Sequence, residues 1–388
     1  MTEKSPTTLW RGFLASSGKI IAMGGTTMIE KTLTLEDLEK TLTQLLAKIH
    51  GLDQEAMERV QTRLDMLTKP QGSLGQLEVI AKQLGGIQGT AEPQVRGKAV
   101  LLMAGDHGVV EEGVSAFPQE VTPQMVYNFL RGGAAINVLS RQADAEVVCT
   151  DVGVAFPLEP EELMRKRVRS GTANIAKGPA MTRKEALQAL LTGAEVAQGA
   201  IERGINVLAT GDMGIGNTTP SSAIVAVFTG QDIAKVVGRG TGINDRSLAH
   251  KRAVIEKALA INVPNPDDPL DVLTKVGGLE IAAIAGAILQ AAASRTAVVI
   301  DGFISTASAL IAAKLSPTSV HYMIPSHGSV EPGHRSALRL LGFEPMLNLN
   351  MRLGEGTGAA LSFYLIEAAT RILKEMATFA DAGVSEGR

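Results

Sequence analysis

Short runs of apolar and β-branched residues alternate with longer stretches of helical periodicity along most of the chain. Such alternation predicts a parallel sheet covered by helices on both faces. Ligands of open α/β sheets bind beyond the carboxyl ends of the strands, and several of these runs end in loops rich in Gly, Asp, Asn, Ser or His. We therefore expect the loops to converge on one cleft. The candidate strands are residues 98–104, 146–151, 205–210, 297–301, 320–324 and 346–349.

Amphipathic helical patterns stand at both ends of the chain, and we expect them to pack together as a smaller helical domain. Two precede the first strand, at residues 35–49 and 54–67, and one runs from Thr357 to about residue 377. The expected fold class is α/β, with a doubly wound, mainly parallel, Rossmann-like sheet. The expected division is a disordered extension (1–27), a helical segment of the small domain (28–92), an α/β substrate-binding domain (93–350), and a loop and helix that return to the small domain (351–388).

Composition narrows the class of protein. The 388 residues, 45% of them apolar, suffice for one large core, and the net charge of −3 comes without a basic cluster. A chain without a basic cluster has no charged surface of the kind that binds nucleic acid or an anionic membrane. The most apolar window, residues 278–300, contains Glu280 and Arg295, so it predicts a buried helix followed by a strand rather than a membrane span. The single cysteine, Cys149, and the lack of a secretory signal pattern in residues 1–30 favour a reducing cytoplasm.

An Asp106–His107 pair follows the first predicted strand. His107 fits a base, a metal ligand or a group that only fixes the loop, and Asp106 fits a residue that binds nearby backbone amides. Structural and functional explanations are equally good for this pair. Downstream, Ser115 opens a Ser-Ala-Phe-Pro-Gln stretch in which Phe117 and Gln119 offer an aromatic wall and an amide suited to a flat heterocycle.

Two glycine-rich loops have the composition of an anion site. Glycines at a helix N-terminus expose N–H groups where the helix dipole favours negative charge. In the second loop, Gly240 and Gly242 precede a helix that carries Lys251, so its amides and an ammonium group could hold the same phosphate. Neither loop has Walker A or Rossmann spacing, and a structural turn with a solvated lysine is the alternative. The first loop contains Asp212, Met213, Gly214, Gly216, Asn217 and Thr218.

Two further loops follow predicted strands late in the chain. Asp301 and Gly302 stand at one strand end, and residues 325–334 contain Ser326 and Ser329. The second loop also carries two histidines and a glutamate, which are metal-ligand types. Because its glycines and prolines give no regular spacing, we predict no metal site there.

The chain's last loop places one carboxylate between glycines. Leu353, Gly354 and Glu355 precede a long apolar helix, and Thr357 is expected to cap that helix. The glycines allow a sharp turn and a close approach of a ligand to the backbone. The alternative is an ordinary capping loop with a solvated glutamate.

Taken in order, these loops resemble the nicotinate-nucleotide:dimethylbenzimidazole phosphoribosyltransferase family. The resemblance spans about residues 64–377 and includes a Lys-Pro-Gln-Gly-Ser-Leu-Gly stretch at 69–75. Each motif alone is weak, but six in order are highly specific. The resemblance implies transfer of a 5-phosphoribosyl group from nicotinate mononucleotide to 5,6-dimethylbenzimidazole, which gives α-ribazole 5′-phosphate for the lower ligand of cobalamin. It also implies a homodimer, no cofactor, and small molecules as the binding partners.

The resemblance also assigns roles to individual residues. It implies that Glu355 is the catalytic base. Where the family pattern has glutamate, this chain has Asp212, whose carboxylate is retracted by one methylene. The other implied roles are phosphate binding by Gly214, Gly216 and Lys251, contacts around ribose and nicotinate by Asp301, Gly302, Ser326 and Ser329, and a benzimidazole pocket of Phe117, Gln119, Met213 and Leu353.

The implied chemistry needs only one base. Nicotinate leaves C1′ as a neutral ring nitrogen, so no proton donor is required, while the attacking benzimidazole must lose its other N–H proton. Two alternatives stay open: a non-catalytic nucleotide sensor, against which the intact Glu355 argues, and a transferase or nucleosidase for purine-like bases. Product analysis with several bases separates them.

Overall fold

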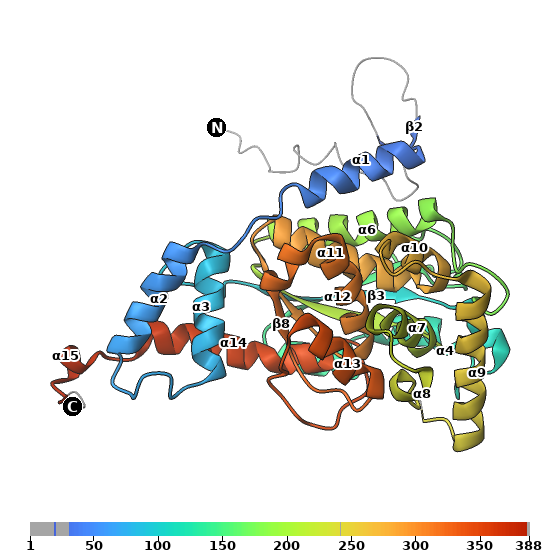
Figure 1. Cartoon of the computed structure of the whole chain (residues 1–388). Helices are drawn as coiled ribbons and strands as arrows, with labels where there is room; N and C mark the ends of the chain where they lie inside the picture. Colours follow the sequence, from blue (N-terminus) through green and yellow to red (C-terminus); the bar gives the residue numbers. More distant parts are fainter. Residues whose placement is uncertain (1–18, 21–30, 241, 386–388) are drawn as a thin grey trace, which may run out of the picture.

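The computed structural model describes residues 19–20, 31–240 and 242–385. Its centre is a six-stranded sheet in the order β5-β4-β3-β6-β7-β8, with every neighbouring pair parallel (Figure 1). Apart from a two-residue pairing of β1 (Lys19–Ile20) with β2 (Lys31–Thr32), the expected extension at residues 1–27 lies outside the described residues. The strands of the large sheet are β3 (Lys98–Gly105), β4 (Glu146–Gly153), β5 (Met164–Arg165), β6 (Val207–Met213), β7 (Ala297–Ile300) and β8 (Met323–Pro325).

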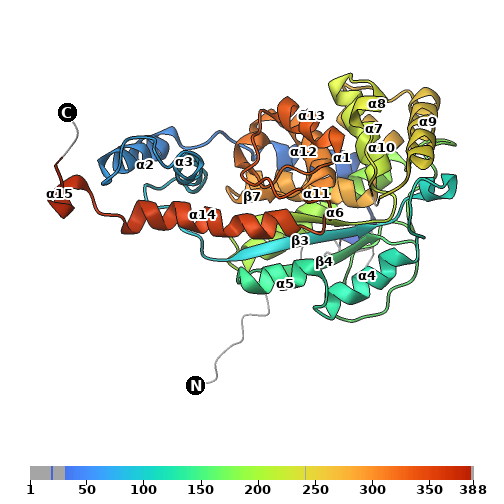
Figure 2. The ribbon, with the colours of Figure 1, turned by 90° about the horizontal axis from the view of Figure 1, so that it is seen from below.

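Helices cover both faces of the sheet, which confirms the doubly wound α/β class (Figure 2). On one face α11 (Leu279–Ala293) packs against α6 (Arg183–Glu202) and four strands, with α12 (Phe303–Leu315) beside it. On the other face lie α4 (Val121–Leu130) and α5 (Ala135–Gln142). The remaining long helices are α1 (Leu35–Leu46), α2 (Gln54–Met66), α3 (Gln76–Gln88), α7 (Thr218–Thr229), α9 (Asp245–Asn262), α10 (Pro269–Val276), α13 (Pro332–Leu341) and α14 (Thr357–Glu375), with short α8 (Ile233–Val236) and α15 (Phe379–Ala382).

The order of the strands places a topological switch point between β3 and β6. After β3 the chain adds β4 and β5 on one side, and then returns to place β6 against the other side of β3. The connections that leave the carboxyl ends of β3 and β6 therefore diverge, and the opening between them is where α/β folds bind ligands. The Asp106–His107 loop and the first glycine-rich loop both start at this opening.

Most strand predictions are confirmed, and three elements differ. A 3₁₀ helix at Pro317–Tyr322 occupies most of the expected strand at 320–324, so β8 is only three residues long. Residues 346–349 form no strand and contribute a single bridge, Leu347 to His327. Short β5 had too few residues to give a period-two pattern. The apolar window at 278–300 is α11 followed by β7, as expected.

The end of the chain returns to the N-terminal helices. α14 contacts α2 and α3, and Arg63 Nη2 of α2 donates a hydrogen bond to Met376 O, 3.0 Å away. By contrast α1, which we expected in the same helical unit, packs against α6 and α11 (Figure 1), with Leu38, Leu42 and Leu45 as its buried stripe. Among the described residues, none of the helices combines the length and apolar character needed to span a bilayer.

Candidate active site

The loop before α14 has an unusual backbone. Gly354, Glu355 and Gly356 follow one another with φ of 79°, 62° and 91°, so the glutamate shares the left-handed conformation of its glycine neighbours. A non-glycine residue in this region is uncommon and persists where the surroundings hold it. Those surroundings include β6, because a Cβ atom added to Gly211 would lie 2.6 Å from Glu355 O. The loop therefore rests directly on the strand backbone, which only glycine at position 211 allows.

Asp301, at the end of β7, holds the same loop from the other side. Its Oδ1 accepts a hydrogen bond from Ala359 N (3.0 Å) and its Oδ2 accepts one from Gly356 N (3.3 Å). These are the free amides of the first turn of α14, which a capping side chain normally satisfies. The expected cap was Thr357, but this residue is already helical and its hydroxyl donates to Gly354 O. A distant strand end thus replaces the local cap.

The carboxyl group of Glu355 points at the N-terminus of α5. Its Oε2 accepts a hydrogen bond from Ile136 N at 3.3 Å, and only 5% of the residue is exposed. Burial raises the pKa of Glu355; the Ile136 amide acts in the opposite direction, and the negative charge of Asp301 adds to the rise. A carboxylate with a raised pKa is a stronger base at neutral pH.

A cavity of about 400 Å³ opens beside this loop at the carboxyl ends of the strands. It is lined by residues from the β6 end, the second glycine-rich loop, the start of α12 and the loops on either side of α13. Nine of the residues proposed from sequence line it: Phe117, Asp212, Asn217, Thr218, Gly240, Gly302, Ser329, Leu353 and Gly354. The convergence of strand-end loops that the sequence predicted is therefore observed.

Asp212 presents a nearly buried carboxyl group to the cavity from the end of β6. Its Oδ2 accepts a hydrogen bond from Asn217 Nδ2 (2.9 Å), while Oδ1 has no hydrogen-bond partner among the described residues. Burial raises the pKa of Asp212 well above its ordinary value, and the negative charges of Asp301 and Glu280 act in the same direction. This carboxyl group therefore tends to keep its proton.

Lys251 lies on α9 behind the second glycine-rich loop. It is almost fully buried, and its Nζ donates a hydrogen bond to Thr218 Oγ1 at 2.6 Å. Burial lowers the pKa of Lys251 to about 8, against the effect of the nearby Glu331 carboxylate. Gly240, with φ of 51°, brings the loop backbone next to both side chains. An amide, a hydroxyl and an ammonium group thus meet at one end of the cavity, which is a ligand set suited to phosphate.

Comparison with known proteins decides the family. A family model described as phosphoribosyltransferase matches residues 49–384. The nicotinate-nucleotide–dimethylbenzimidazole phosphoribosyltransferases of Geotalea uraniireducens and Desulforamulus reducens are each 58% identical to the chain, over 89% of its length and 99% of theirs. A crystal structure of the enzyme of that name from Thermus thermophilus superposes with a TM-score of 0.82 at 48% identity, covering 87% of this chain and all of that one.

The chain belongs to the nicotinate-nucleotide–dimethylbenzimidazole phosphoribosyltransferase family. Family resemblance assigned substrate contacts to more residues than the cavity brings together. Glu355 itself adjoins the lining through Gly354, and Lys251 reaches it through Thr218. The other proposed residues that do not line the cavity are Asp106, His107, Ser115, Gln119, Met213, Gly214, Gly216, Gly242, Asp301 and Ser326.

Two of these residues, Asp106 and His107, bind neighbouring structural elements in this phosphoribosyltransferase. His107 Nε2 lies 2.8 Å from Glu280 Oε1, and Asp106 accepts hydrogen bonds from Thr122 Oγ1 (2.7 Å) and Ala155 N (2.8 Å). Burial alone would lower the pKa of His107, but the Glu280 carboxylate outweighs it and the pKa is raised. These contacts join the end of β3 to α11, α4 and the segment after β4, so they fix the position of the β3 loop beneath the cavity loops.

Sequence reasoning missed six residues that line the phosphoribosyltransferase cavity: Phe303, Ile304, His327, Glu331, Asn350 and Arg352. Phe303 completes the Asp-Gly-Phe motif at residues 301–303, and Arg352 directly precedes Leu353, so proximity to Gly302 and Leu353 was the available signal. His327 and Glu331 belong to the loop that was weighed only as a metal site.

The histidines of that loop have other partners. His334 Nδ1 accepts a hydrogen bond from Ser329 N (2.8 Å), so its proton lies on Nε2, which donates to Thr306 Oγ1 at 3.0 Å. Burial lowers the pKa of His334 to about 3, and the ring is neutral. Across the described part of the chain, no group of three or more His, Cys, Asp or Glu side chains is arranged to hold a metal ion.

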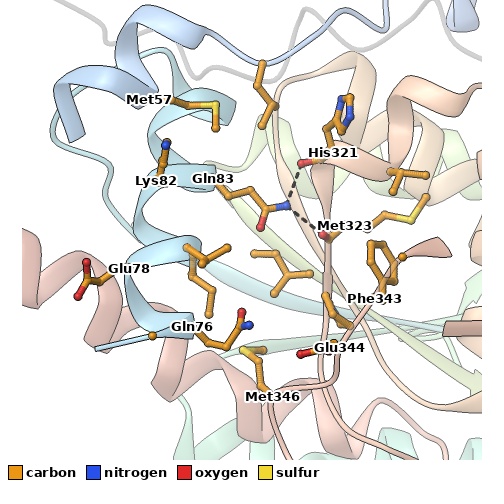
Figure 3. A pocket seen from close by; sticks show the side chains of 18 of the residues that line it. Met57, Gln76, Glu78, Lys82, Gln83, His321, Met323, Phe343, Glu344 and Met346 are labelled. Carbon is orange, nitrogen blue, oxygen red and sulfur yellow. Dashed lines mark hydrogen bonds between the residues drawn. The ribbon is translucent and has the colours of Figure 1, made fainter. Parts of the chain in front are cut away.

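A larger hollow of about 1000 Å³ lies between α3 and the β8 edge (Figure 3). Gln83 spans it, because its Nε2 donates to His321 O (2.8 Å) and Met323 O (3.0 Å). Much of the rest is apolar, including Met57, Met346 and Phe343. Since its ionisable side chains do not form a buried cluster comparable with Asp212, Asp301 and Glu355, we assign the chemistry to the smaller cavity.

Proposed function

We propose that this chain transfers the 5-phosphoribosyl group of nicotinate mononucleotide to 5,6-dimethylbenzimidazole, giving α-ribazole 5′-phosphate and nicotinate. Identity of 58% over nearly the full length of relatives that carry this enzyme name supports the reaction. The observation that carries the assignment of a base is the buried, left-handed Glu355 next to a cavity with a phosphate-type ligand set at its other end.

In the proposed reaction, one ring nitrogen of the benzimidazole attacks C1′ while the bond from C1′ to the nicotinate nitrogen breaks. The bonding pair returns to the pyridinium ring, which leaves as neutral aromatic nitrogen. The N–H on the other benzimidazole nitrogen becomes acidic, and Glu355 takes that proton through a hydrogen bond of about 2.6–3.2 Å. Attack opposite the leaving ring turns a β-linked nucleotide into an α-linked one.

The remaining acceleration comes from alignment. Holding both rings across C1′ can supply roughly 7–11 kcal/mol of the barrier. We assign the phosphate to Lys251, Thr218 and Gly240, and the ring face to Phe117 and Leu353, whose side chains are about half exposed at the cavity. Such exposed apolar side chains gain buried area when a flat ligand covers them.

Incubation of the purified protein with nicotinate mononucleotide and 5,6-dimethylbenzimidazole tests the reaction. Chromatography and mass analysis should show nicotinate release and an α-linked ribotide that requires both substrates. Nucleotide binding without product would instead support the sensor. Replacing the base with adenine or a phenol would measure acceptor preference.

We also propose that the enzyme is a homodimer in the cytoplasm. The family resemblance supports the dimer, and a single, buried thiol at Cys149 suits a reducing compartment. Light scattering after size-exclusion chromatography tests the dimer, because a monomer mass at assay concentration would contradict it.

A further inference from the structure

Glu331 is a nearly buried carboxylate with only half of its hydrogen-bonding capacity used. It stands directly before α13 and lines the cavity, with 6% of its surface exposed. Its Oε1 accepts a hydrogen bond from Gly240 N at 2.9 Å, whereas Oε2 has no partner among the described residues. Burying a carboxylate without full compensation is unfavourable, so its position needs an explanation.

The donors around Glu331 are those expected to hold the phosphate. The Glu331 carboxylate accepts the hydrogen bond of the Gly240 amide, and its negative charge interacts with the positive charge of Lys251. A Cβ atom on Gly240 would lie 2.8 Å from Thr218 Oγ1 and 3.4 Å from Lys251 Nζ, so the three donors are close together. A carboxylate oxygen therefore lies at one of the donors that a phosphate oxygen would use.

The backbone is built to accept this carboxylate. A Cβ atom added to Gly238 would lie 2.0 Å from Glu331 Oε2 and 2.6 Å from Pro332 Cδ. The second glycine-rich loop thus lies directly against the carboxyl group and Pro332, and any larger residue at position 238 would force one of them to shift. This close fit argues against a chance side-chain orientation at the cavity wall.

The charged groups that act on Glu331 are both cations. Lys251 approaches from α9 and Arg352 from the loop before α14. Arg239, in the covering loop, is paired with Asp245, and His334, in the first turn of α13, is neutral. Burial raises the pKa of Glu331, while Lys251, the Gly240 amide and Arg352 oppose the rise.

We propose that Glu331 is the counter-anion of the phosphate cradle, by which we mean the Gly240 amide, the Thr218 hydroxyl and the Lys251 ammonium group. Without a bound phosphate, the Glu331 carboxylate accepts the hydrogen bond of the Gly240 amide and balances the charge of Lys251. When a phosphate group binds, Glu331 takes up a proton. A second full negative charge could not share these donors without strong repulsion. The empty cradle is thereby kept from holding an uncompensated buried ammonium group, and phosphate binding is coupled to one proton. The inference rests on the proposed function only for the identity of the phosphate-bearing ligand.

Calorimetric titration with sulfate tests this coupling without catalysis. The titration is repeated in buffers of different ionisation enthalpy, because the measured heat then reveals how many protons are taken up on binding. Sulfate does not change its own protonation near neutral pH, so any proton taken up goes to the protein. At about pH 7, Lys251 is already mostly protonated, because its pKa is about 8. Uptake at this pH therefore does not come mainly from Lys251, and its loss in a Glu331 variant assigns it to Glu331. We expect proton uptake in the natural protein and none beyond background in Glu331→Gln.

The same variant tests affinity. Glutamine can still accept from Gly240 N but carries no charge, so we expect Glu331→Gln to bind sulfate about tenfold more tightly at about pH 7. Glu344→Gln is the matched control, because it removes a carboxylate charge at the larger hollow (Figure 3) and should bind like the natural protein.

Two results would overturn the proposal. One is equal or weaker sulfate binding by folded Glu331→Gln, which would leave Glu331 as a loop-fixing residue. The other is sulfate binding by the natural protein without proton uptake, which needs no variant and stands even if Glu331→Gln misfolds. A natural protein that forms no ribotide would contradict the proposed function but leave both sulfate measurements interpretable.

Discussion

Glu355 and Ile136 are 219 positions apart, yet the carboxyl Oε2 of one accepts a hydrogen bond from the backbone N–H of the other at 3.3 Å. Ile136 lies in the first turn of α5, where free amides and the helix dipole favour a negative charge. Burial therefore raises the pKa of the proposed base, while the helix end opposes the rise by favouring the ionised carboxylate. This balance gives the first prediction.

Glu355→Gln should lose turnover by about 100- to 10,000-fold, because an amide cannot accept the benzimidazole proton. Its affinity for nicotinate mononucleotide should change little, since the phosphate donors lie elsewhere. Steady-state rates and calorimetry measure the two effects. Glu375→Gln, at the exposed far end of α14, is the control and should keep full activity. Unchanged turnover in Glu355→Gln would remove the base assignment.

The affinity for nicotinate mononucleotide should fall as pH rises through about 8, because Lys251 loses its positive charge there. Turnover at saturation should instead rise from acid toward neutral pH, as Glu355 with its raised pKa gives up its proton. Calorimetry across pH measures the fall in affinity, and rate measurements at saturating substrate measure the rise in turnover. Lys251→Met should bind weakly at every pH and lose the fall near pH 8, so that only the pH dependence from proton uptake by Glu331 remains. An unchanged fall near pH 8 would assign it to another group.

Gly211→Ala should disturb the site without touching substrate. Its new methyl group would meet Glu355 O at 2.6 Å, so the loop must shift, at a cost of about 1–3 kcal/mol in the free energy of unfolding. Turnover should fall with it, because the base is displaced. Gly178→Ala, which would meet no atom within 4 Å, is the matched control. Denaturant unfolding and rates check both variants, and normal activity in Gly211→Ala would show that the loop tolerates movement.

Asp212→Asn should stabilise the fold at neutral pH. The folded pKa of Asp212 lies above the unfolded one, so the folded state binds more protons and stability is lost as pH rises through the folded value. Asparagine removes this loss. We expect the melting temperature of Asp212→Asn to exceed that of the natural protein at about pH 8 and to approach it near pH 4. An equal difference at both pH values would contradict the assignment.

Local pattern was enough to predict the sheet. The runs at 98–104, 146–151 and 205–210 are apolar because strands buried under helices on both faces need no alternation, and they appear as β3, β4 and β6. The apolar helix α11 was equally visible. What the pattern could not supply was the two-residue β5, or the use of Pro317–Tyr322 as a 3₁₀ turn, because tertiary packing decides such short elements.

The candidate site was predictable where a motif carries its own geometry. Gly354 and Gly356 indicated a sharp turn around Glu355, but not that Glu355 itself would be left-handed. The cap of α14 could not be found locally, since Asp301 comes from β7 and displaces the expected Thr357. Glu331 was missed for the same reason: its partner, Gly240, is 91 positions away.

The return of α14 to the N-terminal helices has a consequence for biosynthesis. Domains tend to fold from the N-terminus as the ribosome releases them, and β3, β4 and β6 can pair early by that rule. Here the proposed base, its support at Gly211 and the helix that contacts α2 and α3 are joined only when α14 emerges. A chain truncated before Glu355 would lack both its base and the packing partner of α2 and α3, so activity should appear only after α14 has been synthesised.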